Sequence, residues 1–172
     1  MVKEINKWLR VYNTLEEIKI VLNTIPNNKI VVYTYGVWDL LHPGHIKLLT
    51  RAKNLGDFLI VGVVKDEPVR ELKGLNRPIQ PLHERLYNVG ALRCVDAAIV
   101  QNIYDPSAEL KSIKKVDILT KGNDWINIPG KSTIESLGGK LVKLSYSDGH
   151  STSSLVSKIS GKKVAKHGEP KC

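Results

Sequence analysis

The chain contains few of the residues that mark secreted or membrane proteins. Only two of its 172 residues are cysteines, Cys94 and Cys172, which are too few for the disulfide framework of a small secreted domain. No apolar run approaches the ~18 residues that a membrane-spanning helix needs. The first five residues also do not lead into the apolar core of a secretory signal. We therefore expect a cytoplasmic protein with no membrane partner.

Acidic residues are also scarce, since 17 Asp and Glu face 26 Lys and Arg and leave a net charge of +9. Part of the excess lies at the end of the chain, where residues 158–172 contain five lysines and one glutamate. The rest suits a small anionic ligand such as a nucleotide or a sugar phosphate. A nucleic-acid-binding tail is an alternative. Because no aromatic residues are interleaved with its lysines and no reading module is recognisable, we expect no nucleic-acid partner.

Hydrophobic and charged fractions of 42% and 25% are typical of a soluble globular protein, and the length suits one domain. Apolar segments of strand and helix type alternate along the chain. Strands are predicted over residues 30–35, 58–64, 97–100, 116–120 and 140–144. Helices are predicted over 3–12, from Thr14 to Ile25, from Pro43 to Gly56, and over 67–72, 82–93, 106–114 and 153–159.

This alternation predicts an α/β fold with a Rossmann-like parallel sheet and helices on both faces. We expect residues 1–28 to form a helical extension packed on the domain, residues 29–160 to form the domain, and residues 161–172 to form a flexible basic tail. In such sheets ligands bind beyond the carboxyl ends of the strands. Functional residues should therefore follow strands.

Two histidines follow the first long strand, where a helix is predicted to begin. Pro43 suits the first turn of that helix, and Gly44 lets an anion approach the backbone closely. His42 and His45 are three residues apart, so they can face the same way beside free backbone N–H groups that attract phosphate. The alternative is that His42 caps the helix and His45 packs in the core.

Residues 42–45, His-Pro-Gly-His, resemble the HxGH signature of the cytidylyltransferase-like nucleotidyltransferases, and residues 34–41 are similar to the lead-in of that family. The resemblance implies that His42 and His45 are catalytic, hold nucleotide phosphates and stabilise charge on the α-phosphorus. It also implies that the nucleotide lies over this helix start. The residues it places beside the nucleotide are Tyr35, Gly36, Val37, Trp38, Asp39 and Gly44.

A loop with three basic residues, Lys73, Arg77 and Arg85, precedes and enters the helix predicted over 82–93. Taken alone, such residues are more often solvated than functional. The segment is similar, however, to the "KG…RP…P…ER" pattern of bacterial heptose-1-phosphate adenylyltransferases. That resemblance implies catalytic and substrate-binding roles for Lys73, a substrate-binding role for Arg77, and a nucleotide phosphate contact for Arg85.

Two further clusters follow later strands. Gly122, Asp124 and Trp125 offer a close backbone approach, a hydrogen-bond acceptor and a stacking face; a capped turn and a covered core edge are the alternative. These residues resemble the G-D-[WY] segment that lies beside the nucleotide in family members.

The last cluster opens the final predicted helix, where Gly149 permits a tight turn and hydroxyls follow it. Simple capping is the alternative. The cluster looks like the family's G-I-S-T-[ST] motif, which binds the β- and γ-phosphates, although His150 replaces an aliphatic residue and Tyr146 stands where some glycerol-phosphate enzymes carry Arg. The residues this resemblance selects as nucleotide-binding are Gly149, Ser151, Thr152 and Ser153.

The resemblance implies a nucleotidyltransferase that moves a nucleoside monophosphate from ATP or CTP to a phosphorylated sugar or polyol and releases pyrophosphate. The heptose-1-phosphate adenylyltransferases are favoured over the glycerol-3-phosphate cytidylyltransferases. A non-catalytic nucleotide-binding protein is the alternative from another class. We expect Mg²⁺ to arrive with the nucleotide, held by its phosphates and by no protein side chain, and we expect a homodimer, because family members are commonly dimers.

Overall fold

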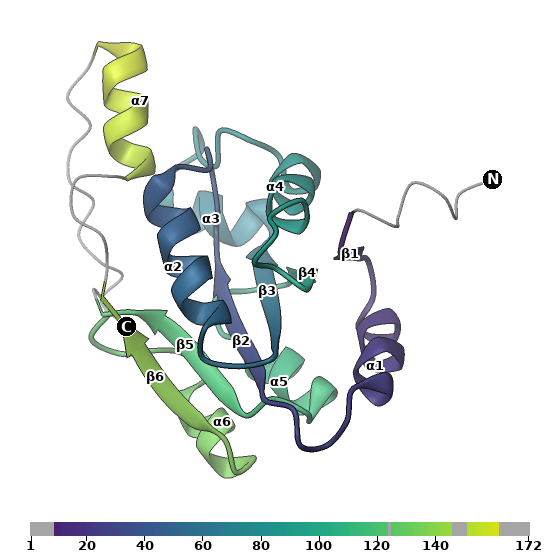
Figure 1. Cartoon of the computed structure of the whole chain (residues 1–172). Coiled ribbons are helices and arrows are strands. Elements are labelled where there is room, and N and C mark those ends of the chain that lie inside the picture. Colours follow the sequence, from purple (N-terminus) through teal and green to yellow (C-terminus); the bar gives the residue numbers. More distant parts are fainter. Residues whose placement is uncertain (1–8, 124, 146–150, 162–172) are drawn as a thin grey trace.

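Six parallel strands form one sheet in the computed structural model, which describes residues 9–123, 125–145 and 151–161 (Figure 1). The strands lie in the order β1-β4-β3-β2-β5-β6, and every neighbouring pair is parallel. The strands are β1 (Val11–Tyr12), β2 (Val31–Gly36), β3 (Phe58–Val64), β4 (Ala97–Gln101), β5 (Ile118–Gly122) and β6 (Lys140–Leu144). The helices are α1 (Leu15–Thr24), α2 (Pro43–Lys53), α3 (Asp66–Lys73), α4 (Leu82–Gly90), α5 (Ser107–Ile113), α6 (Lys131–Ser136) and α7 (Thr152–Ser160).

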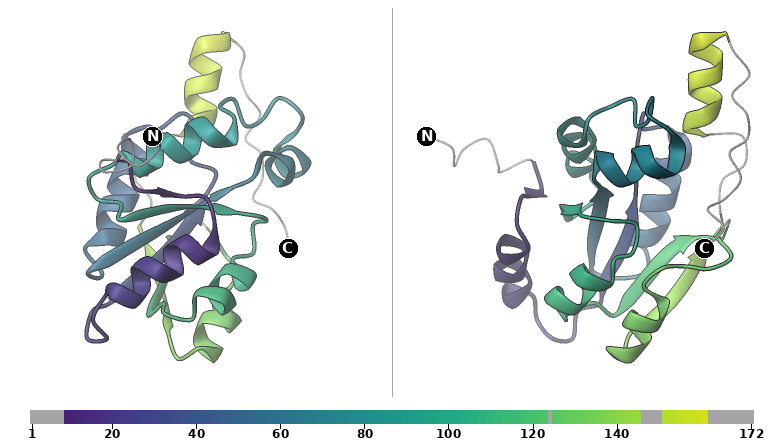
Figure 2. Two further views of the ribbon diagram at one scale, coloured as in Figure 1. Left: turned by 90° about the vertical axis from the view of Figure 1, so that its right-hand side faces the viewer. Right: turned by 180° about the vertical axis from the view of Figure 1, so that it is seen from behind.

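Helices cover both faces of the sheet, as predicted (Figures 1 and 2). Along β2 the side chains alternate between two buried clusters: Val31 and Tyr33 pack with α1, α5 and α6, whereas Val32 packs with α2 and α4. Strands buried on both faces are expected to be continuously apolar, which explains the unbroken run Phe58–Val64. The α/β prediction is confirmed. Within the described residues, no helix is both long and apolar enough to cross a bilayer.

The chain leaves the neighbouring strands β2 and β5 in opposite directions. From β2 it proceeds to β3 and β4 on one side, and it then returns to β5 and β6 on the other side. The carboxyl ends of β2 and β5 therefore flank the position at which open α/β sheets bind their ligands. The β2 and β5 clusters singled out in the sequence both lie at this position.

The helix predicted over residues 3–12 is wrong at its end, because Val11 and Tyr12 form edge strand β1 beside β4. Arg10 anchors the strand through its guanidinium, which donates to the carbonyls of Arg93 and Val95 at 3.1 and 2.5 Å. The segment before residue 28 thus supplies a strand of the sheet as well as a helix. Residues 1–8 and 162–172, the latter most of the predicted basic tail, lie outside the described part of the chain.

The helix predicted from Thr14 is confirmed together with its capping box. The Thr14 hydroxyl accepts a hydrogen bond from the Glu17 backbone N–H at 3.2 Å, and the Glu17 carboxylate accepts from the Thr14 N–H at 3.4 Å. This reciprocal pair satisfies two of the donors that a helix start leaves free. It fixes α1 on the face of the sheet that carries Tyr33 and Tyr35.

Candidate active site

The loop between β2 and α2 has an unusual backbone. Trp38 and Leu40 have φ values of 57° and 48°, a left-handed region that residues other than glycine rarely adopt. Such conformations persist only where the surroundings impose them. Here the Trp38 indole N–H donates to the Gly62 carbonyl at 3.0 Å, and the Leu40 N–H donates to the Gln80 side-chain oxygen at 3.0 Å. The loop is therefore held from both sides.

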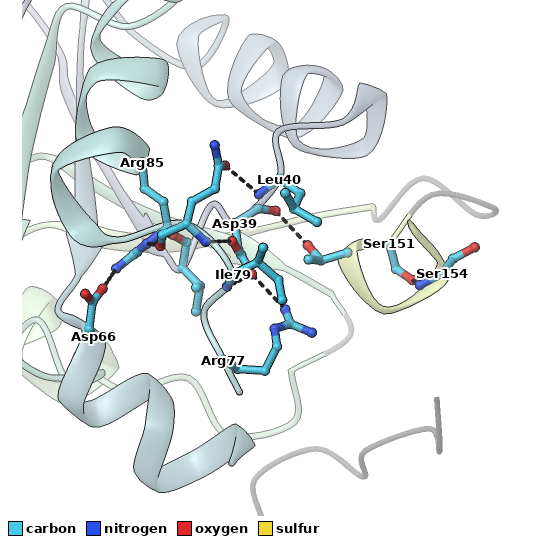
Figure 3. Close-up of polar contacts among 11 residues, drawn as sticks. Asp39, Leu40, Asp66, Arg77, Ile79, Arg85, Ser151 and Ser154 are labelled. Atoms are coloured by element: carbon cyan, nitrogen blue, oxygen red, sulfur yellow. Dashed lines mark hydrogen bonds and ion pairs between the residues drawn. The ribbon is translucent and has the colours of Figure 1, made fainter. Parts of the chain in front are cut away.

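Asp39 forms the other anchor of this loop. Its carboxylate accepts hydrogen bonds from the backbone N–H groups of Ile79 and Gln80 at 2.9 and 3.0 Å and lies 3.2 Å from the Arg77 guanidinium (Figure 3). Asp39 is buried. It therefore joins the β2–α2 loop to the segment before α4, and its carboxylate faces protein groups.

His42 and His45 lie together at the start of α2. Their rings stack with centroids 3.8 Å apart and planes 23° apart, and the Trp38 and His45 rings meet in a T-shaped contact with centroids 5.3 Å apart. His42 is the N-cap residue, but within the described part of the chain its side chain makes no capping hydrogen bond. The capping alternative is thus wrong for His42. Gly44, which lies between the two histidines in the sequence, is buried in the first turn of α2.

The pKa of His45 is lowered from its ordinary value of 6.5 to about 3 by burial and by the nearby positive charges of His42 and Lys73. His45 is therefore uncharged at neutral pH and presents one N–H donor. Its Nδ1 is enclosed without a hydrogen-bond partner among the described residues. A neutral imidazole donor beside the Lys73 ammonium group is an arrangement that a bound polyanion would stabilise.

Lowering the pH should therefore destabilise the ligand-free protein through His45. Between pH 6.5 and about 3 the unfolded chain binds a proton on this side chain that the folded protein excludes, so the free energy of unfolding falls as the pH falls. We expect His45→Gln to lose less melting temperature than wild type between pH 7 and pH 4.5, measured by circular dichroism. Equal losses in the two proteins would show that His45 does not resist protonation.

Arg85 lies beneath the site instead of on its surface. The side chain is fully buried, and its guanidinium donates to the carbonyls of Gln80 and Val37 at 3.0 and 2.6 Å and to the Asp66 carboxylate at 2.5 Å (Figure 3). These protein contacts occupy the guanidinium in this structure, and the nucleotide phosphate contact expected for Arg85 stays a prediction. Arg85 thus connects Val37, in the loop after β2, with Asp66, which follows β3, and holds these two segments in position.

At the carboxyl end of β5, the buried Lys121 links this strand to β2. Its ammonium group donates to the Tyr35 carbonyl at 2.6 Å and lies 3.8 Å from the centroid of the Tyr35 ring and 4.7 Å from that of Trp125. Tyr35 points into the core, where its hydroxyl donates to the Pro129 carbonyl at 3.0 Å and where burial and the Asp105 charge raise its pKa. Only the backbone of Tyr35 thus lies at the strand end.

Glycines allow close approach at both strand ends. A Cβ at Gly36 would lie 3.0 Å from the Trp38 ring, so a larger residue there would displace that indole. Gly122 is the buried last residue of β5 and leads to Trp125. Asp124 and Gly149, both expected to contact the nucleotide, lie outside the described residues.

The start of α7 lies beside the start of α2, as Figure 1 shows. The Ser151 hydroxyl accepts from the Ser154 N–H at 3.1 Å and caps α7, while the Thr152 hydroxyl donates to the Asp39 carbonyl at 2.8 Å (Figure 3). Ser153 follows in the first turn of the helix. The structure therefore brings the first and last sequence clusters together.

Sequence reasoning missed three polar residues at this edge of the sheet. Asp66, two residues after β3, pairs with Arg85; Gln80 holds Leu40; and Tyr104, in the loop after β4, lies beside Trp125 with ring centroids 6.5 Å apart. Asp66 and Tyr104 could have been found from the sequence, because both follow closely after predicted strands, where functional residues are expected. That of Gln80 depends on contacts between segments 40 residues apart.

Comparisons with known proteins agree with this geometry. Residues 33–163 match the family described as cytidylyltransferase-like. The bifunctional protein HldE of Syntrophotalea carbinolica is 40% identical over 133 residues, which cover 76% of this chain and 27% of that protein. The HldE of Helicobacter hepaticus is 39% identical over 139 residues, covering 80% and 28%. The chain thus spans about a quarter of the length of these relatives.

Solved structures give the same result. A lipopolysaccharide core biosynthesis protein from Thermoplasma volcanium has a TM-score of 0.62 and 35% identity, and the match covers 70% of this chain and 100% of that one. A pantoate-beta-alanine ligase from Francisella tularensis shares the fold, with a TM-score of 0.54, 14% identity, and coverage of 84% and 69%. Sequence, fold and site geometry agree: the chain belongs to the cytidylyltransferase-like family of nucleotidyltransferases.

Proposed function

We propose that this chain transfers adenosine monophosphate from ATP to a heptose 1-phosphate and releases pyrophosphate. The observation that carries the proposal is the stacked pair His42 and His45 at the start of α2, close to Lys73 and beside the crevice between β2 and β5. The similarity to HldE proteins and to a lipopolysaccharide core biosynthesis protein supports a sugar phosphate as the acceptor.

The reaction needs no protein nucleophile, because the acceptor phosphate is already ionised. One of its oxygens forms a bond to the α-phosphorus, the bond from that phosphorus to the bridging oxygen breaks, and the electron pair leaves with pyrophosphate. The protein contributes position and charge stabilisation. In this proposal His42, His45 and the backbone N–H groups of α2 hold the α-phosphate, while Lys73 and Thr152 hold the outer phosphates.

The donor set suits a metal that enters with the nucleotide. Among the described residues, no three His, Cys, Asp or Glu side chains gather as metal ligands, and the site offers imidazole, ammonium and hydroxyl donors that bind phosphate. We propose that Mg²⁺ is held by phosphate oxygens, whose charge it neutralises. Removing it with EDTA should abolish turnover, and added Mg²⁺ should restore it. Full activity in EDTA would contradict this role.

A pyrophosphate-release assay tests the activity itself. ATP and CTP are each combined with D-glycero-β-D-manno-heptose 1-phosphate and with glycerol 3-phosphate, and we expect release only with ATP and the heptose. Release with CTP and glycerol 3-phosphate would identify the cytidylyltransferase alternative. A thermal shift by a nucleotide without any release would identify a non-catalytic nucleotide-binding protein. We also propose a homodimer, which light scattering after gel filtration tests.

A further inference from the structure

Part of the carboxyl edge of the sheet is not used by the residues assigned to the nucleotide phosphates. It lies where the loops after β4 and β5 meet: Tyr104 from the first loop lies beside Trp125 from the second, with ring centroids 6.5 Å apart and planes 34° apart. The Lys121 ammonium group lies over the Trp125 ring, 4.7 Å from its centroid. Two aromatic side chains and a cation thus form one cluster at the carboxyl ends of β4 and β5.

Two side-chain hydrogen-bond donors, close enough for the charge of one to act on the other, are enclosed without partners in the described part of the chain. They are the Tyr104 hydroxyl and Nε of Arg77. Arg77 is nearly buried, with 11% of its side chain exposed, and its Nη2 faces Asp39 at 3.2 Å. Buried donors without an acceptor are rare in proteins, and each one calls for an explanation such as an absent ligand.

The surrounding charge favours an anionic acceptor. The pKa of the Tyr104 hydroxyl is raised to about 12 by burial, against the opposing positive charges of Arg85 and Arg77. The hydroxyl therefore stays protonated and can donate a hydrogen bond to an incoming acceptor. An ionised phosphate, which offers acceptor oxygens alone, matches a hydroxyl and a guanidinium N–H.

This pair of donors is coupled to the nucleotide side of the site through one residue. The Asp39 carboxylate faces Arg77, while its backbone carbonyl accepts the hydrogen bond from Thr152. A phosphate bound at Arg77 would therefore be adjacent to a triphosphate bound at Thr152 and at the start of α2. In-line attack of one phosphate on the other requires that adjacency.

We infer that Tyr104 and Arg77 bind the phosphate group of the acceptor, a sugar phosphomonoester, and that Trp125 packs against its sugar ring. This inference rests on the proposed function, because it assigns the second substrate of the same reaction. Tyr104 is thereby a substrate-binding residue that neither the motifs nor the family resemblance selects.

Tyr104→Phe tests the inference because it removes one oxygen and keeps the ring beside Trp125. Calorimetry measures binding of the heptose 1-phosphate and of glycerol 3-phosphate to protein saturated with Mg²⁺ and a methylene analogue of ATP or CTP that cannot release pyrophosphate. We expect both phosphomonoesters to bind about tenfold more weakly, because the variant loses one hydrogen bond to a charged group. The nucleotide analogue should bind to the variant as tightly as to wild type. The melting temperature without ligands should not fall, since the lost hydroxyl has no hydrogen-bond partner among the residues that the structure describes.

Tyr87→Phe is the matched control, because Tyr87 is half exposed on α4, and its binding constants should equal those of wild type. Unchanged phosphomonoester affinity in Tyr104→Phe would overturn the inference, as would the failure of wild type to bind either compound. Weaker binding of the sugar phosphate alone would overturn the phosphate contact. Tyr104-dependent binding without any pyrophosphate release would reject the proposed function and leave the inference standing.

Discussion

Replacing His45 by alanine should lower kcat by about 10²- to 10³-fold and change the KM for the nucleotide much less. The reason is that a donor at the α-phosphate gains strength as charge develops there in the transition state, and removing one such donor typically costs this factor. The stacked geometry with His42 at 3.8 Å fixes the ring before the nucleotide arrives. Steady-state pyrophosphate release with varied nucleotide measures both constants, and their ratio separates transition-state from ground-state binding.

His83→Ala is the matched control for this experiment. His83 lies on the exposed side of α4, so its removal should leave kcat and KM at wild-type values. The melting temperature of His45→Ala should stay close to that of wild type at neutral pH, because Nδ1 of His45 has no hydrogen bond to lose within the described residues. A kcat near that of wild type would remove His45 from the chemistry, whatever its effect on KM.

The parts of this structure that the sequence predicts are those decided by local chemistry. The β-branched residues of Val31–Gly36 predict β2, and Pro43 predicts the start of α2. The spacing of His42 and His45 predicts that the two histidines lie together, and all these residues fall within a stretch of fifteen. The Thr14 capping box is local in the same way. In each case the residues that decide the conformation lie within one or two turns of each other.

The parts that the sequence does not predict depend on distant partners. Val11 and Tyr12 have the spacing of a helix, but they pair with Ala98 and Ile99, more than 80 residues away. The ion pair between Arg85 and Asp66, 19 residues apart, is likewise not predictable from the segment around Arg85. The pattern of a short segment does not reveal contacts with distant segments. It therefore does not predict the structure of residues that depend on such contacts.

The site is therefore built in two layers. Arg85 and Asp66 form a lower layer that fixes the loops after β2 and β3, and the upper layer consists of His42, which stacks on His45, and Lys73, whose charge acts on His45. The acidic side chains hold the loops: Asp66 pairs with Arg85, and the Asp39 carboxylate accepts hydrogen bonds from the backbone N–H groups of Ile79 and Gln80.

Replacing Arg85 by methionine should destabilise the fold by about 3–5 kcal/mol, which is the usual cost of removing one partner of a buried ion pair. The change leaves the Asp66 carboxylate without its guanidinium and removes the donors to the Val37 and Gln80 carbonyls. For a chain of this length the melting temperature should fall by about 10 °C. Calorimetry or urea unfolding followed by circular dichroism measures the difference.

Arg70→Met is the control for that loss, because Arg70 also faces Asp66, at 3.8 Å, but from a side chain that is 45% exposed. An exposed pair of this kind contributes at most about 1 kcal/mol, so the control should unfold almost as wild type does. Adding Asp66→Asn to Arg85→Met should recover part of the lost stability, since it removes the uncompensated charge. Equal destabilisation by the Arg85 and Arg70 variants would show that the lower layer does not hold the site, because burial is what distinguishes the two arginines.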